Sequence, residues 1–122
     1  MTRLPIEVFI VVRRVGEYLV VHRAPAGGAY WHGIAGGLES GETPAEAAER
    51  ELLEETGLAA EPLPLERSFR YDDVLVHTFL VDVPTGWEPQ LDHEHDDYRW
   101  LPRDDAVELL YWPEPKELLL SL

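Results

Sequence analysis

The segment Gly36–Leu58, GGLESGETPAEAAERELLEETGL, carries the strongest helix signal in the chain. Thr43 stands directly before Pro44, so a capping hydroxyl precedes a proline at the first helical position. Glu46 follows Thr43 by three residues and completes a capping box, and Gly57 is the left-handed residue at which helices commonly end. We therefore predict a helix that runs through AEAAERELLEE and stops at Gly57.

Three carboxylates of this helix share one side. On a helical wheel of about 100° per residue, Glu51, Glu54 and Glu55 fall in one sector. The other positions divide into an apolar stripe beside that sector (Ala45, Ala48, Leu52) and a solvent side (Glu46, Glu49, Arg50). Arg50 can reach Glu54 one turn further along the helix, so no positive charge offsets the repulsion between Glu51 and Glu55. Either this is a plain acidic solvent face, or a divalent cation such as Mg²⁺ binds these oxygens.

The formal charge of −14 is spread unevenly along the 122 residues. Residues 36–58 hold seven acids against one arginine, a net of −6, and residues 88–105 hold seven against two, a net of −5. Charge alone fits two solvated faces or two acidic walls that face each other around cations. It argues against sequence-independent nucleic-acid binding, which needs Lys and Arg against phosphate.

Length and composition favour a single domain, residues 1–122. With 45% hydrophobic and 10% aromatic residues, the chain has more apolar material than acidic disordered segments do. The absence of cysteine excludes a disulfide framework, a thiolate zinc site and a cysteine nucleophile. No run reaches about 18 apolar residues and the first twelve residues lack a signal-peptide pattern, so we expect a cytoplasmic protein without membrane association.

The sequence predicts strands on both sides of the helix. Apolar, β-branched runs predict a hairpin before it and two strands joined at a turn after it. The expected elements are strands at Ile6–Arg13, Tyr18–Arg23, Tyr30–Ala35, Leu65–Tyr71, Val74–Val83 and Tyr98–Leu101, a loop at Pro84–Asp97, and helices at Pro102–Leu110 and Glu114–Leu120. Because strands are both hairpin-joined and helix-separated, we expect an α/β fold with a mixed sheet covered by helices.

The spacing within Gly36–Leu58 resembles the Nudix box. That pattern is glycine, five residues, glutamate, seven residues, then Arg-Glu-apolar-any-Glu-Glu-any-Gly-apolar. All nine defined positions match: Gly36, Glu42, Arg50, Glu51, Leu52, Glu54, Glu55, Gly57 and Leu58. The box covers 23 of 122 residues, and the resemblance implies a Nudix fold, an α/β/α sandwich with a mixed β-sheet.

The resemblance also implies a reaction, the hydrolysis of a nucleoside diphosphate linked to another group with Mg²⁺ or Mn²⁺. By position in the motif, Glu51, Glu54 and Glu55 would hold the metal, and Glu51 would alternatively serve as the base. The cations would reverse the repulsion between acidic site and polyphosphate, polarise phosphoryl oxygens and activate a water.

Other box residues would have supporting roles by the same resemblance. Arg50, which we count with the catalytic group, would hold the helix carboxylates in place without touching substrate. Glu42 would close the loop onto the helix. The backbone carbonyl of Ala35 or Gly36 would complete the metal sphere.

A second acidic stretch, Asp92–Leu101, looks like the Glu-His…Trp-apolar stretch of many Nudix chains. There a downstream glutamate often completes the metal site or acts as base, and we assign Glu94 to this role. His93 and His95 alternate with Glu94, but two histidines and one acid in a loop are weak evidence for a separate zinc site. For His95 a solvent-facing and a functional position both stay open, whereas Trp100 is expected in the core.

The substrate is less closely defined. Arg23 ends a predicted strand and is a candidate for a terminal phosphate, with a solvated strand end as the alternative. The segment Tyr30-Trp31-His32 resembles MutT-like and dihydroneopterin-triphosphate-type members, which makes Trp31 and His32 candidate substrate contacts. Candidates for stacking a base are Trp31, Tyr71, Trp87, Tyr111 and Trp112.

We therefore predict an enzyme that converts a nucleoside triphosphate-like substrate to the monophosphate and pyrophosphate. The alternatives are an ADP-ribose or dinucleoside polyphosphate pyrophosphatase and a non-catalytic nucleotide-binding Nudix sensor. A sensor should have lost some box carboxylates, and none is missing here. The expected partner is a small nucleotide, and apolar residues of Leu118–Leu120 pack either inward or across a homodimer.

Overall fold

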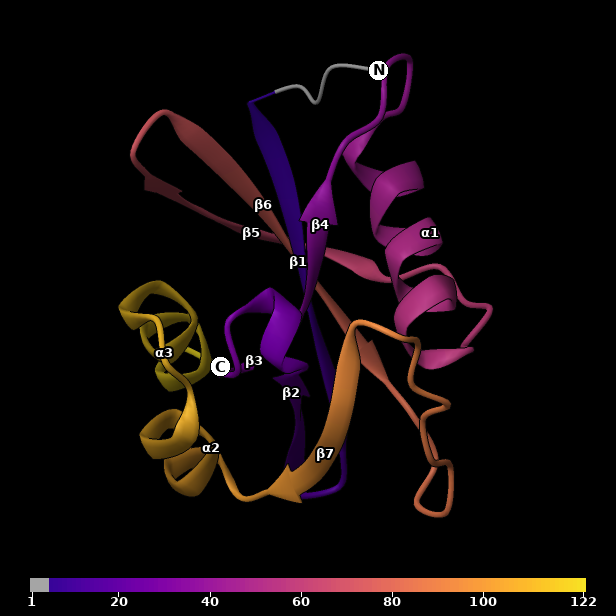
Figure 1. Cartoon of the computed structure of the whole chain (residues 1–122), viewed down its shortest axis with the longest axis vertical. Helices are drawn as coiled ribbons and strands as arrows, with labels where there is room; N and C mark the ends of the chain where they lie inside the picture. Colours follow the sequence, from indigo (N-terminus) through magenta and orange to yellow (C-terminus); the bar gives the residue numbers. More distant parts are fainter. Residues whose placement is uncertain (1–4) are drawn as a thin grey trace.

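The structure, a computed structural model, describes residues 5–122 (Figure 1). Its strands form one mixed sheet: β1 (Ile6–Arg14), β2 (Glu17–Arg23), β3 (Trp31–His32), β4 (Ile34–Gly37), β5 (Leu63–Tyr71), β6 (Val74–Asp82) and β7 (His95–Leu101). Its helices are α1 (Pro44–Thr56), α2 (Arg103–Leu109), α3 (Pro113–Leu120) and a short 3₁₀ turn, η1 (Pro25–Gly27). The expected hairpins, box helix and closing helices are confirmed to within two residues at their ends.

Strand β1 lies at the centre of the sheet. The main strand order is β3-β2-β1-β6-β5, with β4 also paired to β1 and β7 to β2. Strand β1 runs parallel to β6 and antiparallel to β2 and β4. Because both of its faces are covered, it reads as a nearly continuous apolar run in the sequence.

The two faces of the sheet carry separate cores (Figure 1). Successive side chains of a strand point to opposite faces, so Val8 and Ile10 of β1 pack on the side of α1 while Phe9 and Val11 pack on the side of α2 and α3. Helix α1 covers one face, and α2 with α3 covers the other. This arrangement is an α/β/α sandwich, and the fold prediction is confirmed.

The predicted ends of α1 are confirmed by their hydrogen bonds. The Glu46 backbone N–H donates to Thr43 Oγ1 at 3.2 Å, and the Thr43 N–H donates to Glu46 Oε1 at 2.9 Å, which closes the capping box. Gly57 has φ +79° and donates its N–H to the Leu53 carbonyl at 2.9 Å. A residue with a Cβ would be strained at this φ, so glycine marks the C-terminus.

The buried stripe of α1 differs from the predicted one. Ala45 is exposed, because it lies in the first turn, and Ala47 is buried in its place with Ala48 and Leu52. The buried residues of the helix are Ala47, Ala48, Glu51, Leu52, Glu55 and Thr56. Two of the box carboxylates therefore lie inside the buried stripe and not beside it.

The expected strand Tyr30–Ala35 is two strands, β3 and β4, interrupted at Gly33. Strand β3 pairs with β2 and strand β4 pairs with β1, so the chain changes neighbours at Gly33. A Cβ at Gly33 would collide with the ring of Phe9, and this close passage of the backbone over the ring requires glycine.

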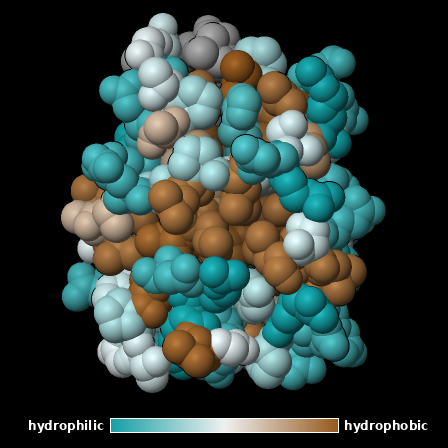
Figure 2. Space-filling view, turned by 180° about the vertical axis from the view of Figure 1, so that it is seen from behind, coloured by the Kyte–Doolittle hydropathy of each residue, from teal (hydrophilic) through white to brown (hydrophobic). Residues whose placement is uncertain are grey.

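The C-terminal helix answers part of the question about Leu118–Leu120. Leu118 and Leu119 are buried with Ala106 and Leu110 of the α2–α3 side, so they pack inward. Leu120, in contrast, is exposed. On the face of the molecule seen from behind, hydrophobic residues form a band across the middle (Figure 2). The homodimer stays a prediction. No helix in the described part of the chain has the length and apolarity needed to cross a membrane.

Candidate active site

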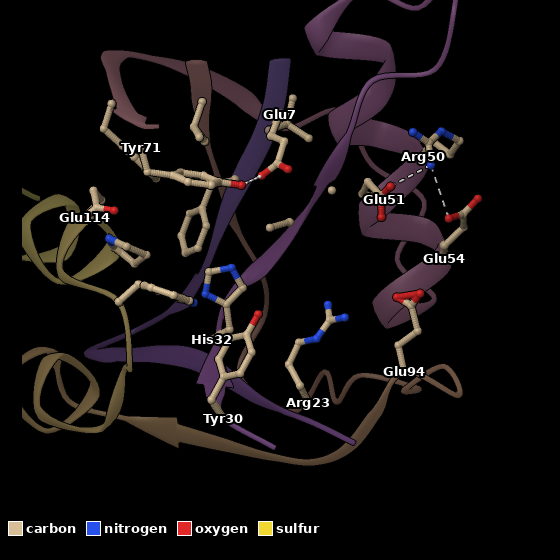
Figure 3. A pocket seen from close by; sticks show the side chains of 18 of the residues that line it. Glu7, Arg23, Tyr30, His32, Arg50, Glu51, Glu54, Tyr71, Glu94 and Glu114 are labelled. Atoms are coloured by element: carbon tan, nitrogen blue, oxygen red, sulfur yellow. Dashed lines mark hydrogen bonds and ion pairs between the residues drawn. The ribbon is translucent and has the colours of Figure 1, made fainter. Parts of the chain in front are cut away.

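A cavity of about 840 Å³ joins the Nudix-like segment to distant parts of the chain. Side chains of α1 and of the loop before β7 lie at one end, namely Arg50, Glu51, Glu54 and Glu94 (Figure 3). Tyr71 and Glu114 lie at the other end, and Glu7, Arg23, Tyr30 and His32 lie between. The cavity therefore has a carboxylate-rich end and a ring-lined end.

Arg50 holds the carboxylate-rich end together. Its Nε and Nη2 donate to the two oxygens of Glu42 at 2.7 and 3.0 Å, and Nη2 also donates to the Gly37 carbonyl at 3.0 Å. Its Nη1 donates to Glu51 at 2.8 Å and more distantly to Glu54 at 3.4 Å. Arg50 is therefore not on the solvent side of α1, where it was predicted. Its guanidinium lies closer to the Glu51 carboxylate than to that of Glu54.

The bidentate contact with Arg50 lowers the pKa of Glu42. Glu42 also accepts a hydrogen bond from the Glu39 backbone N–H at 2.9 Å, so the loop before α1 is closed onto the helix. This is the position that the sequence predicts for Glu42.

Glu51 is buried where β4 passes closest to α1. A Cβ added to Gly36 would collide with the Glu51 carboxylate, so the backbone of β4 lies directly against it. Ala35 and Gly36 also line the cavity. Glycine at this position therefore allows a backbone segment and a carboxylate to share one small space.

Glu55 is the most unusual ionisable group of the site. It is only 2% exposed, and among the described residues neither carboxylate oxygen has a hydrogen-bond donor. Burial raises its pKa well above the ordinary value, and the Glu51 carboxylate adds to this effect. An unpaired buried carboxylate is costly unless another group binds its oxygens.

His95 is the nearest basic group to Glu55, at 3.6 Å between Nε2 and Oε1. Its other ring nitrogen, Nδ1, is 2.8 Å from an oxygen of Asp92, and its side chain is fully buried. The solvent-facing alternative for His95 is wrong, because β7 begins at this residue and not after Asp97. Sequence analysis did not predict the contact between Asp92 and His95, for which their three-residue spacing was the available signal.

The donor set at this end suits a divalent cation. Glu51 and Glu55 are buried carboxylates, and the two oxygens of Glu55 have no other partner. As placed, no three His, Cys, Asp or Glu side chains within residues 5–122 converge tightly enough to hold an ion. Further ligands would have to come from Glu54 and Glu94, which are exposed at the cavity wall, or from the backbone of β4.

Arg23 and His32 line the middle of the cavity, as predicted for substrate contacts (Figure 3). The Arg23 Nε and the His32 Nδ1 are both buried without a hydrogen-bond partner. Burial lowers the pKa of His32 to about 4, and the charge of Arg23 contributes, so His32 is neutral at pH 7. The middle of the cavity therefore offers a guanidinium whose Nε has no hydrogen-bond partner within residues 5–122, and one neutral imidazole.

Trp31 does not line the cavity, although sequence analysis grouped it with His32. The two residues are adjacent in β3 and point to opposite faces of the strand. Trp31 lies below the Arg99 guanidinium, at 4.8 Å from the ring centroid. Its position gives no support to a role in substrate binding.

The other aromatic candidates lie in three kinds of place, and Tyr111 is exposed and does not line the cavity. Tyr71 and Trp112 line the cavity, while Trp87 packs edge-on against Trp100 at 6.2 Å. Trp100 is half-buried against the α1-side core, as expected. The cavity-lining rings that sequence analysis did not include among the stacking candidates are Phe9, Tyr30 and Phe69.

Comparison with known proteins agrees with this architecture. A family model described as the NUDIX domain matches residues 3–122. Among curated proteins, the octanoyltransferase of Myxococcus xanthus is 38% identical over 100 residues, 75% of this chain and 28% of that protein. Phosphatase NudJ of Escherichia coli is 49% identical over 57 residues, 47% of this chain and 37% of NudJ. The chain thus spans well under half the length of these relatives.

Solved structures are similar over nearly the whole chain. An Ap4A hydrolase from C. elegans, in a binary complex, superposes with a TM-score of 0.81 at 26% identity, covering 94% of this chain and 93% of that one. The dihydroneopterin triphosphate pyrophosphohydrolase of E. coli superposes with a TM-score of 0.87, covering 100% and 97%. At 19% identity this second likeness concerns the fold alone.

Proposed function

The chain belongs to the Nudix family of hydrolases, and from that premise we propose that it converts a nucleoside triphosphate-like substrate to the monophosphate and pyrophosphate with Mg²⁺ or Mn²⁺. One observation carries the proposal: a single cavity is lined by the box carboxylates Glu51 and Glu54, by Arg23, and by the rings of Tyr71 and Trp112. A nucleotide bound between these groups would have its base at the ring-lined end and its reacting phosphates at the carboxylate-rich end.

The box residues would hold the cation. Glu51, Glu54 and Glu55 supply carboxylate oxygens, Arg50 keeps Glu51 in one orientation, and the carbonyl of Ala35 or Gly36 adds a neutral ligand. Bound Mg²⁺ would polarise the phosphoryl oxygens and lower the pKa of the attacking water. The unpaired oxygens of Glu55 support this assignment.

Arg23 would bind a phosphate oxygen. Its guanidinium points into the cavity with Nε unpaired, and a charge-assisted hydrogen bond to phosphate would satisfy it (Figure 3). His32 is neutral and beside it, so His32 can exchange a hydrogen bond with a hydroxyl or phosphate without adding charge.

Glu94 would act as the base or complete the metal site. It lines the cavity from the loop before β7, on the side of Glu54 (Figure 3). We expect Glu94→Gln to lower turnover as much as, or less than, the box substitutions. An unchanged rate in Glu94→Gln would transfer this role to Asp92, Asp96 or Asp97.

The test is release of pyrophosphate or phosphate across a nucleotide panel, with Mg²⁺ and with a chelator. We expect metal-dependent pyrophosphate release from at least one nucleoside triphosphate, and Glu54→Gln serves as the inactive reference. If no nucleotide of the panel gives a metal-dependent product, the enzyme proposal is refuted in favour of a binding protein.

Dinucleoside polyphosphates are the second candidate substrate class. They are supported by the 26% identity to the C. elegans Ap4A hydrolase over 94% of this chain. ADP-ribose, the other alternative, has no comparable observation behind it. Including all three classes in the panel at equal concentration ranks them by kcat/KM.

A further inference from the structure

Three carboxylates line the cavity outside the Nudix box and outside the loop before β7. They are Glu7 of β1, Asp72 of the β5–β6 turn and Glu114 of α3. None of the roles proposed above uses them, and a polyphosphate would be repelled by them. Arg23 and Arg50, the arginines that line the cavity, belong to its middle and to its opposite end. The ring-lined end and the adjoining part of the cavity, where Glu7 lies beside Tyr71, are therefore rich in acceptors.

Of these three carboxylates, Glu7 is the one that accepts a side-chain hydrogen bond from another residue in the described part of the chain. It is half-buried on the central strand, opposite Gly37 of β4 and Val76 of β6. Tyr71 Oη donates to Glu7 Oε1 at 2.6 Å across the cavity (Figure 3). Burial, together with Glu7, raises the pKa of Tyr71 above its ordinary value, so Tyr71 keeps the proton that it donates.

What remains after this hydrogen bond is a set of acceptors. Glu7 Oε2, the second lone pair of Glu7 Oε1 and the lone pairs of Tyr71 Oη can only accept from a ligand. The walls around them are apolar, formed by Val8, Phe9, Phe69 and Val76. A ligand ring that enters this end must bring N–H or O–H donors, because an acceptor placed against a half-buried carboxylate is left unpaired and repelled.

We infer that Glu7, oriented by Tyr71, selects a ring whose edge carries a ring N–H next to an amino group, as the edge of guanine does. The inference rests on the proposed function, since it names the ring of the same substrate. A carboxylate pairs with two adjacent donors at once. Adenine presents an amino group next to an acceptor nitrogen, and hypoxanthine has the N–H without the amino group, so each leaves one contact unmade or repulsive.

The test compares kcat/KM for GTP, ITP and ATP at saturating Mg²⁺. ITP differs from GTP only by the missing amino group, so the GTP/ITP ratio isolates one hydrogen bond to the carboxylate. We expect a ratio of about 10 or more for the unmodified protein. In Glu7→Gln the amide turns a donor toward the ring and the ratio falls to about 1 to 2.

Two further variants separate this effect from a loss of charge or of folding. Glu66→Gln makes the same substitution at an exposed position of β5 that does not line the cavity, and it should keep the GTP/ITP ratio. Tyr71→Phe leaves Glu7 ionised but without its partner, and it should lower the ratio by a smaller factor. Melting temperatures report on folding, and Tyr71→Phe keeps the test usable if Glu7→Gln does not fold.

A measurement of nucleotide binding distinguishes failure of this inference from failure of the proposed function. Calorimetry with GMP and IMP in metal-free buffer reads ring preference without any turnover. Tighter binding of GMP, lost in Glu7→Gln, supports the inference even if no triphosphate is hydrolysed. Equal binding of GMP and IMP, a GTP/ITP ratio near 1, or a ratio that Glu7→Gln leaves unchanged would overturn it.

Discussion

The two ends of the cavity are built in different ways. At the carboxylate-rich end, Arg50 donates to Glu42, Glu51, Glu54 and Gly37, all within the 23-residue Nudix box. At the ring-lined end, residues of β1, β5 and α3 come together from distant parts of the chain. The Arg50 network of the carboxylate-rich end thus depends on contacts that are local in sequence, whereas the ring-lined end and the His95–Glu55 contact depend on tertiary contacts.

The buried carboxylates of α1 differ in exposure from the two aromatic stacking candidates that line the cavity. Glu51 and Glu55 are 7% and 2% exposed, whereas Tyr71 and Trp112 are 39% and 44% exposed. Substitution of Tyr71 or Trp112 should therefore alter which substrate is used at little cost in stability. Substitution at the carboxylate-rich end should alter whether any substrate is used.

The largest effect is expected from the box carboxylates. We predict that Glu54→Gln and Glu55→Gln each lower kcat by at least about 10²-fold, because each removes a charge that would hold the metal. Glu55→Gln should also keep or raise the metal-free melting temperature, since it removes a buried unpaired carboxylate. Full activity in either variant, measured with the best substrate of the panel, would contradict the metal assignment.

A smaller loss, of about 10- to 100-fold in kcat, is expected for Arg50→Lys. Lysine keeps the charge but cannot hold both oxygens of Glu42 while reaching Glu51. Arg13→Lys is the matched control, because Arg13 makes a similar bidentate contact with Asp82 on the surface. If both lysine variants had the same turnover, Arg50 would have no positioning role and the contrast between the two ends would fail.

Arg23→Gln should affect binding more than turnover. We expect KM to rise about 10-fold with a smaller change in kcat, as loss of one charge-assisted hydrogen bond to phosphate predicts. The melting temperature should stay within a few degrees, because the Arg23 Nε has no partner in the protein. A fall in kcat with constant KM would instead place Arg23 at the reacting phosphate.

The smallest effect concerns the pH dependence of stability. The pKa of His32 is about 4 in the fold and about 6.5 in an unfolded chain, so the unfolded chain binds the extra proton between these values. The His32 contribution to the free energy of unfolding is therefore complete above about pH 6.5 and is lost as the pH falls toward 4, by at most about 3 kcal/mol. Urea unfolding at pH 7 and pH 5 should show a smaller difference in His32→Asn than in the unmodified protein. An equal difference would show that His32 titrates alike in both states.

Much of the carboxylate-rich end could be predicted from the sequence. The capping residues of α1, its terminal glycine and the spacing of its carboxylates are local features, and each depends on chain neighbours within a few turns. The same holds for the hairpins and closing helices, whose apolar runs and turns are continuous in the chain. For these elements local preference and final structure agree, so their approximate bounds were predictable.

Errors occurred where a position depends on a non-local neighbour. Ala45 has the right angle on the helical wheel but lies in the first turn, where no core residue covers it. The sequence does not show which of the adjacent residues Trp31 and His32 faces the cavity. Only the pairing of β3 with β2 decides this. The sequence did not decide whether His95 is buried, because its burial depends on its position beside Glu55 and on where β7 begins.

The sequence by itself determined the family, the helix and the spacing of its carboxylates, because these are written in one segment with fixed spacing. The tertiary structure alone decided that Glu55 is buried without a hydrogen-bond partner and that Tyr71 meets Glu7 across 64 positions of the chain. Burial and hydrogen bonding are properties of surroundings, and the surroundings of both residues are supplied by strands far away in sequence.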